Sequence, residues 1–267
     1  MPGLKYPIAH VPMLGKGSIL FDIFDSNGLP TGLRHLGNCT KFEIDLKDDI
    51  AELYQSLNKS VTLVATAVKK RQPKISITGT DFSSDHMAIT QMSTAKSTLA
   101  VASGTVTSET LITAVQSVNA KGRYFRTLTP NVDPTGTAPV LTQTPTTLVA
   151  GTDYVLIDAV SGIFYIPLTS TINTSGTTAV TVTYHTLVGN FDQVAGATVP
   201  FQQGHLVFVP DPVDGQKVGC DIWRCNLHPN GQLGLIADDY GNWQLEGNIL
   251  DDTANHPLSP FYQYTFY

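Results

Sequence analysis

The sequence predicts a mainly β fold, in which a β-rich domain with one helix is interrupted by a small β-sandwich-like module. Three observations support this class. Charged residues make up only 14% of the chain, against a usual quarter, and Thr, Ser, Gly and Val, which suit strands and turns, take their place. Short strand patterns separated by turn sequences recur along the chain. The middle third differs in composition from the segments on either side.

The first segment, 1–97, supplies strands near 18–24, 41–46, 61–69 and 73–79 and a helix within 80–92. Thr80 or Asp81 is expected to cap this helix, and Asp81 and Asp85 favour the positive end of its dipole.

A second helical spacing occurs within 48–57, where Ile50, Leu53, Tyr54 and Leu57 fall at i, i+3, i+4 and i+7. This segment is expected to form either a short helix or a long, partly ordered loop.

The second segment, 98–188, is nearly uncharged and rich in Thr, Ser, Gly and Pro. Strand patterns lie near 123–128, 154–158, 163–166 and 179–186, and residues 159–162 are typical of a hairpin turn. Several short strands punctuated by turns predict a sandwich-like module. We expect it to interrupt the fold formed by its neighbours.

The third segment, 189–267, returns to longer strands, with turn sequences at 228–231 and 238–241. The strands are expected near 205–209, 217–227, 232–236 and 242–250. The aromatic end, 261–267, alternates like a strand and is expected to pack on a partner or on the core.

Net charge is −6, and it is unevenly distributed. The three segments carry +2, −1 and −7 in chain order. Two interpretations of this distribution stay open. The charges are an ordinary solvated surface that keeps the protein soluble, or they have a role in assembly, in which acidic and basic faces meet between subunits or acidic residues line a channel.

Neither a membrane span nor a secretory signal peptide is expected from the sequence. The odd set Cys39, Cys220 and Cys225 implies no disulfide framework. Cys220 and Cys225 lie five apart, which predicts opposite faces of one strand, and buried structural thiols are favoured over a metal site.

No motif predicts catalysis. The G-x-S-x-G, H-E-x-x-H and Walker patterns are missing from the sequence, and the acid pairs lack the spacing of a calcium loop. We therefore expect no enzyme, no metal and no cofactor. Lys69, Lys70 and Arg71 are expected at a hairpin tip rather than in a nucleic-acid site.

A resemblance covers roughly 1–97 and 189–267. The run Leu33–Asn38 followed by 42–44, and the predicted hairpin 61–78 followed by a helix, resemble the opening of the major tail tube protein of long-tailed (siphovirus-type) bacteriophages. The runs NLHPNGQLGLI (226–236) and WQLEG (243–247) resemble the closing strands of the same family.

This resemblance implies that the parent domain is a tail-tube-type β-sandwich or barrel with a flanking α-helix, a fold shared with the type VI secretion tube. Six subunits would join sheet edges into a ring with a continuous inner β-barrel, and stacked rings would conduct viral DNA without binding it specifically. The middle segment would face outward. The protein would be assembled in the host bacterial cytoplasm and reside in the virion tail, with the tape measure, terminator and baseplate or tip proteins as partners.

The same resemblance places site residues. The hairpin 61–78 and strands 217–227 and 242–250 would line the bore, with Asp221 and Glu246 as its acidic residues. The expected loop 47–60 would contact the next ring. Candidate contacts between subunits are Asp48, Asp49, Tyr54, Lys69, Lys70 and Arg71.

Three rival hypotheses remain. A carbohydrate-binding or adhesion β-sandwich would suit the Ser/Thr-rich middle, and it predicts a stable monomer that binds glycans. An enzyme with a dispersed site is the second. A tail terminator or a type VI secretion tube protein is the third, and the inserted segment disfavours the type VI protein, whose subunits are usually smaller.

Overall fold

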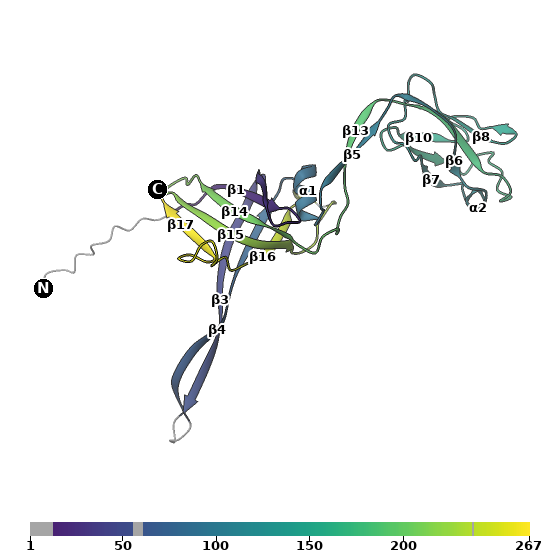
Figure 1. Cartoon of the computed structure of the whole chain (residues 1–267). Helices are drawn as coiled ribbons and strands as arrows, with labels where there is room; N and C mark the ends of the chain where they lie inside the picture. The colour runs from purple at the N-terminus through teal and green to yellow at the C-terminus, as the bar shows by residue number, and fades with distance from the viewer. Residues whose placement is uncertain (1–12, 56–60, 237) are drawn as a thin grey trace. The chain divides into compact units, whose positions relative to one another are not determined.

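The computed structural model describes residues 13–55, 61–236 and 238–267. Strands account for 53% and helices for 4%, which confirms the predicted mainly β class (Figure 1). The chain divides into two compact units: unit 1 is Met1–Lys96 with Val194–Tyr267, and unit 2 is Ser97–Gln193. No helix among the described residues is long and apolar enough to pass through a membrane.

The described residues of unit 1 form one eight-stranded antiparallel sheet and one helix. The path through the sheet is β2-β1-β14-β15-β16-β4-β3, and β17 also pairs with β15. The sheet does not close into a barrel, so β2 and β3 remain its edges. The elements are β1 (Gly17–Phe24), β2 (Pro30–His35), β3 (Cys39–Gln55), β4 (Thr62–Gly79), α1 (Ser84–Thr90), β14 (Gln202–Pro210), β15 (Val218–Pro229), β16 (Trp243–Ile249) and β17 (Tyr262–Phe266).

The core of unit 1 lies on one face of this sheet. In β16, Trp243, Leu245, Gly247 and Ile249 are buried while the residues between them are not, as the two-residue period of a strand requires. The rings of Phe42 in β3 and Phe208 in β14 stack at 5.5 Å between centroids. Because three strands separate β3 from β14 in the sheet order, this contact shows that the sheet curls around its own core.

Helix α1 confirms the predicted helix in a shorter form. Its N-cap is Ser83, whose hydroxyl accepts from the amide of His86 at 3.3 Å, and Asp85 lies in the first turn. The predicted caps Thr80 and Asp81 are wrong because both residues are engaged before the helix begins. The amide of Thr80 donates to the Asn38 carbonyl at 2.9 Å, and the carbonyl of Asp81 accepts from the Trp243 indole at 2.8 Å.

Strands β3 and β4 form one long hairpin, from Cys39 opposite Gly79 to Gln55 opposite Thr62. Two predictions fail here. The predicted helix or loop at 48–57 is strand over residues 48–55, and 56–57 lie outside the described residues. The predicted strands 61–69 and 73–79 are one strand from Thr62, so the basic run 69–71 lies within β4 and not at a hairpin tip.

Most of the strands expected in the last segment are confirmed. Residues 205–209, 217–227 and 242–250 match β14, β15 and β16, and the aromatic end forms β17. The expected strand at 232–236 is wrong: these residues form a loop in which Leu235 and Ile236 are exposed. Strand β16 already pairs with β15 on one side and β4 on the other, so this segment has no adjacent edge to join.

Unit 2 has a three-stranded sheet, β10-β11-β7, and a four-stranded sheet, β6-β12-β8-β9. Buried residues of both sheets, among them Phe164 of β11 and Tyr184 of β12, form one core, which is the packing of a small sandwich. The elements are β5 (Lys96–Val101), β6 (Gly104–Ile112), α2 (Ala114–Ser117), β7 (Arg123–Arg126), β8 (Val140–Gln143), β9 (Thr146–Thr147), β10 (Val155–Asp158), β11 (Ile163–Ile166), β12 (Val180–Thr186) and β13 (Gly189–Val194).

The predicted hairpin at 154–166 is present as β10 and β11. Gly162 in its turn has a φ of +67°, a conformation that glycine adopts without steric cost. The predicted middle segment, 98–188, lies within unit 2: it begins one residue after the start of the unit and ends five residues before the end of the unit. The later end arises because β13 pairs with β5 in a two-stranded ribbon.

Candidate functional site

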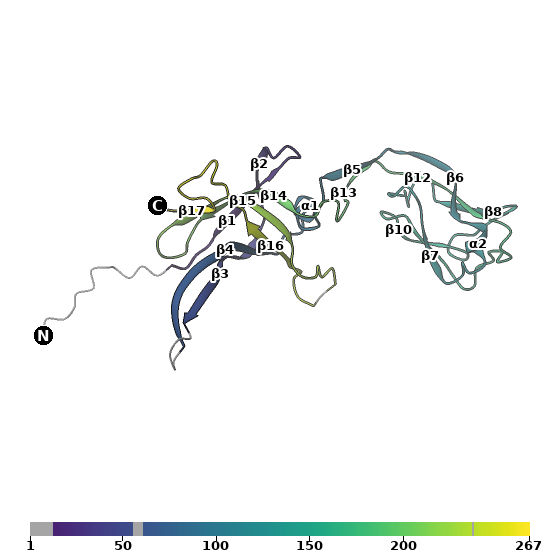
Figure 2. The same ribbon diagram turned by 60° about the horizontal axis from the view of Figure 1, so that its bottom comes forward.

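The hairpin of β3 and β4 extends beyond the rest of the sheet as an arm (Figures 1 and 2). Its core-side residues continue the alternation of Phe42 and Ile44 on β3 and of Ile75 and Ile77 on β4. In the arm, this alternation leads to five apolar side chains that are at least half exposed. We name as the arm's apolar face Leu46, Ile50, Tyr54, Leu63 and Val68, with exposed fractions of 62%, 52%, 53%, 50% and 51%.

These residues pair across the two strands. Ile50 lies opposite Val68, and Tyr54 lies opposite Leu63. Cross-strand pairs of aromatic and β-branched residues stabilise a hairpin, but a two-stranded ribbon covers neither of its faces. By the same alternation, Asp48, Glu52 and Arg71 lie on this side of the arm, so the exposed apolar side chains are interleaved with charged ones. Exposed apolar side chains with polar neighbours are typical of a site of protein association.

Charged pairs explain why the arm is a hairpin at this register. Arg71 lies opposite Asp48 and Lys70 lies opposite Asp49, and the Arg71 Nε is 3.3 Å from Asp48 Oδ1. Opposite charges placed directly across a ladder favour that pairing. Four of the six predicted contact residues therefore lie opposite each other in two pairs across the arm, and Lys69 is the extra residue of a bulge beside them.

Tyr54 is the one predicted contact residue among the five apolar side chains of this face. The sequence prediction missed its neighbours, above all Leu46, Ile50 and Val68. Their signal was present as alternation along 46, 48 and 50, but the helical spacing of Ile50, Leu53 and Tyr54 competed with it.

The other predicted site residues, Asp221 and Glu246, share the polar face of the sheet in unit 1. We define this polar face as the side opposite the core, with Lys74, Gln203, His205, Asp221, Asn226 and Glu246. Both acids are partly exposed, at 32% and 30% of the side chain. The structure thus brings them to one face, on the neighbouring strands β15 and β16.

Their electrostatic surroundings differ. Glu246 accepts from Lys74 Nζ at 3.3 Å, so a neighbouring cation offsets its charge. Asp221 has His205 as its neighbour, with 3.9 Å between Oδ1 and Nε2. Burial lowers the pKa of His205, against the opposing attraction of Asp221 and Asp22, so this ring is neutral at pH 7. Asp221 therefore keeps an uncompensated negative charge on the polar face.

A ring stack holds the segment before β17 onto the same face. Trp223 and His256 are parallel within 3°, with centroids 3.8 Å apart, and His205 stacks on the Trp223 ring at 6.0 Å. His256 Nδ1 is 2.7 Å from Asp252 Oδ2. This packing anchors residues 252–256 to β15.

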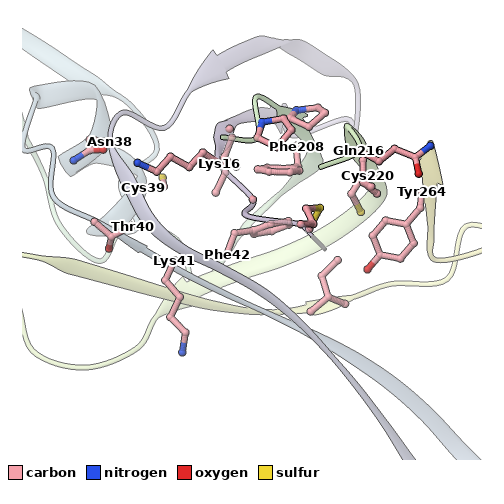
Figure 3. A pocket seen from close by; sticks show the side chains of 18 residues that line it. Lys16, Asn38, Cys39, Thr40, Lys41, Phe42, Phe208, Gln216, Cys220 and Tyr264 are labelled. Carbon is pink, nitrogen blue, oxygen red and sulfur yellow. The ribbon is translucent and has the colours of Figure 1, made fainter. Parts of the chain in front are cut away.

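A cavity of about 650 Å³ opens beside β3, β14, β15 and β17. Figure 3 shows Phe42, Phe208, Cys220 and Tyr264 around it, with Lys16 also among its lining residues. Burial raises the pKa of the Cys39 thiol to about 11 and that of Cys220 to about 12. At neutral pH both groups are protonated thiols, which are poor nucleophiles and poor metal ligands.

The cysteines correct one prediction. Cys220 and Cys225 are both buried in the core of unit 1 and do not lie on opposite faces. Two residues lie between Ile222 and Cys225 on β15, whereas a single residue lies between their partners Leu206 and Gly204 on β14. This β-bulge resets the alternation of β15, and all three cysteines are unbridged.

Potential metal ligands are dispersed through the described part of the chain. Within it, no three His, Cys, Asp or Glu side chains come together in a way that could hold a metal ion. The surfaces that the sequence and structure single out are thus the arm's apolar face and the polar face of the sheet.

Comparison with curated proteins finds no match to this chain. Comparison with protein families matches residues 12–265, which is nearly the whole sequence. The chain belongs to the family described as "Protein of unknown function UCP028589".

Proposed function

We propose that this protein is a structural subunit that assembles with copies of itself. The observation that carries the proposal is the arm's apolar face, which is composed of five side chains at least half exposed on an unpartnered hairpin. Burying such side chains stabilises an association, at about 25 cal/mol for each Å² of apolar surface removed from water.

The open sheet of unit 1 supports the same proposal. In the part of the chain that the structure describes, β2 and β3 are each paired along one side only. Unpaired edges invite pairing with another chain, and joining edges around a rotation axis produces a closed ring. Subunits joined in this way would leave the polar faces of their sheets in register.

The specific form we propose is the tail tube of a long-tailed bacteriophage, as the sequence resemblance implies. Stacked rings, with hexamers as the expected form, would enclose a bore lined by the polar faces. Asp221 would present negative charge to the passing DNA, and a polyanion slides more readily past a neutral or acidic wall than past a cationic one. The protein would act in the virion tail, without catalysis, beside the tape measure, terminator and tip proteins.

Two paired substitutions test the role of the arm. Ile50→Thr with Val68→Thr makes one cross-strand pair of the apolar face polar. Ala51→Thr with Ala67→Thr changes the neighbouring pair, which lies on the opposite face, into the same two residues. Thr is β-branched like Ile and Val and favours strands more than Ala does, so neither double variant lowers strand propensity by losing a β-branched side chain.

We expect the wild-type protein to form rings or tubes in negative-stain microscopy and in sedimentation velocity. The Ile50/Val68 variant should dissociate, because each side chain loses about 1 kcal/mol of burial at every subunit contact. The Ala51/Ala67 variant should assemble like the wild type. Wild-type protein that stays monomeric at every concentration, or equal assembly of both double variants, contradicts the proposal.

The bore is tested separately by charge reversal. Asp221→Lys should slow DNA delivery by assembled particles, because a cation on the wall would hold the phosphate backbone. Glu246→Lys should act more weakly, because Lys74 already offsets the charge of Glu246. Unchanged DNA delivery in the Asp221 variant removes this residue from the proposed lining.

A further inference from the structure

All the basic residues of unit 2 lie within six positions of the chain. Lys121, Arg123 and Arg126 are the only Lys or Arg residues in 97–193. Arg123 and Arg126 are exposed, and Lys121 is partly exposed. Positive charge in this unit is therefore confined to β7 and the turn that precedes it.

The carboxylates of unit 2 mostly brace its own loops. Glu109 accepts from the amide of Leu128 at 2.7 Å, and Asp153 accepts from the amide of Thr171 at 2.6 Å. By contrast, among the described residues neither Lys121 nor Arg123 has a side-chain hydrogen bond or an ion pair. Their charges are available to an external anion.

Arg126 is partly engaged. Its Nε donates to the Ser161 carbonyl at 2.9 Å. A hydrogen bond from the Ser161 side chain lowers the pKa of Asp158, and the charge of Arg126 lowers it by a smaller amount. This contact orients the guanidinium beside the hairpin turn and leaves its remaining N–H groups to accept other partners.

Two tyrosine rings lie beside these cations. Tyr124 of β7 is the direct cross-strand partner of Tyr165 of β11, and their ring centroids are 4.8 Å apart. The neighbouring pair, Phe125 and Phe164, faces the core by the alternation of the strands. Tyr124 is 63% exposed, so its ring is not needed to fill the interior.

A cavity of about 400 Å³ adjoins this position, with Gln116, Asn119, Arg123 and Tyr124 among its lining residues. The volume lies at the small end of ligand pockets. Amide and guanidinium groups beside an aromatic ring supply hydrogen bonds and a flat apolar surface together.

We propose that this β7 patch, which comprises Lys121, Arg123, Tyr124, Arg126 and Tyr165, binds a uronic-acid-bearing polysaccharide. The C–H face of a pyranose ring packs on an aromatic ring, as other apolar groups do. A sugar carboxylate matches the planar fork of an arginine. The patch would give the proposed structural subunit a second activity, and this activity does not depend on assembly.

A nucleic-acid strand fits the same patch less well. It carries a phosphate at every nucleotide and needs a cationic groove that follows its backbone. Two arginines that line a small cavity, with Lys121 near them in a unit that has five carboxylates, favour one or two acidic sugar units.

The test is isothermal titration calorimetry of the full-length protein with three probes: tetragalacturonate, neutral galactotetraose and an eight-residue oligothymidylate. We expect tetragalacturonate to bind most tightly and to weaken as salt is added. Tyr124→Ala and Arg123→Gln should each weaken this binding by about tenfold. Tyr124→Phe should retain it, because the ring remains.

The matched control is Tyr240→Ala, which removes a tyrosine of unit 1 that is 96% exposed; this variant should bind as the wild type does. The melting temperature of each variant verifies folding. Tighter binding of the oligothymidylate would overturn the proposal in favour of nucleic acid. No binding of tetragalacturonate, or binding equal in Tyr124→Ala and wild type, would overturn it outright.

Discussion

Asp153 is the side chain whose replacement should most selectively destabilise unit 2. It is only 2% exposed, and it joins two loops of the sandwich. Its Oδ2 accepts from the amide of Val149 at 2.8 Å, and its Oδ1 accepts from the amide of Thr171 at 2.6 Å and the hydroxyl of Ser170 at 3.3 Å. Asp153→Asn keeps the side-chain volume but replaces one of these oxygens with an NH₂ group. That group is a donor, and it would face the N–H donor that the oxygen accepted from.

The magnitude follows from these contacts. A hydrogen bond to a charged group contributes about 1.5–3 kcal/mol, and a buried amide left without an acceptor costs about 1–3 kcal/mol. We expect Asp153→Asn to lower the free energy of unfolding of unit 2 by about 2–4 kcal/mol. Asp158→Asn, at a more exposed turn of the same unit, is the control and should lose less.

The two units can be followed separately in one urea titration. Both tryptophans, Trp223 and Trp243, belong to unit 1, so tryptophan fluorescence reports on that unit. Hydrogen exchange at the amides of Val149 and Thr171 reports on unit 2. The substitution of Asp153 should move the second signal and leave the first in place. Equal protection of these amides in variant and wild type would refute the bracing role of the carboxylate.

The pH dependence of this effect has a definite sign. Burial raises the pKa of Asp153, but the hydrogen bonds from Thr171 and Val149 together with those from side chains lower it further, and the net pKa is below its ordinary value. A lowered folded pKa stabilises the protein above the unfolded-state pKa of about 3.9. The difference between wild type and Asp153→Asn should therefore be full at neutral pH and shrink as pH falls below about 4 through the folded pKa.

Three further predictions concern the core of unit 1. Ile222→Ala, at a fully buried position, should cost about 2–5 kcal/mol in urea denaturation followed by tryptophan fluorescence; a loss below about 1 kcal/mol would mean that the site collapses around the cavity. Burial raises the pKa of the Cys225 thiol, so Ellman's reagent at pH 8 should modify Cys39 before Cys225, and peptide mapping would show the reverse order if Cys225 were accessible. Gly204→Ala should lower the melting temperature, because its Cβ would lie 2.1 Å from the Asp22 carbonyl oxygen and force β1 from β14; an unchanged value would show that the two strands can separate freely.

Elements with a strong local pattern were predictable from the sequence. The alternation of Trp243, Leu245 and Ile249 matches the buried face of β16, and the turn before Gly162 matches the β10–β11 hairpin. Both patterns arise because one face of a strand enters the core and because a tight turn requires particular residues. A helix after residue 80 was predictable for the same reason, although its cap depended on which polar groups the sheet engages first.

The arm was not predictable, because its structure depends on residues far apart in the chain. Ile50, Leu53 and Tyr54 are spaced as in a helix, but the pairing of Asp48 with Arg71 and of Ile50 with Val68 makes the segment a strand. The spacing of residues within one segment carries no information about a pairing partner some twenty residues away. Tertiary pairing supplies that partner and overrides the local preference.

The same distinction applies to the candidate sites. The resemblance singled out Asp221 and Glu246 on two predicted strands, but the neutralising Lys74 and the neutral His205 beside them became evident in the folded sheet. The cluster of Lys121, Arg123 and Arg126 is visible in the chain, whereas the ring of Tyr165 reaches it through the pairing of β11 with β7. Side-chain type and periodicity are local properties of a polypeptide, but charge compensation and ring stacking depend on which strands become neighbours.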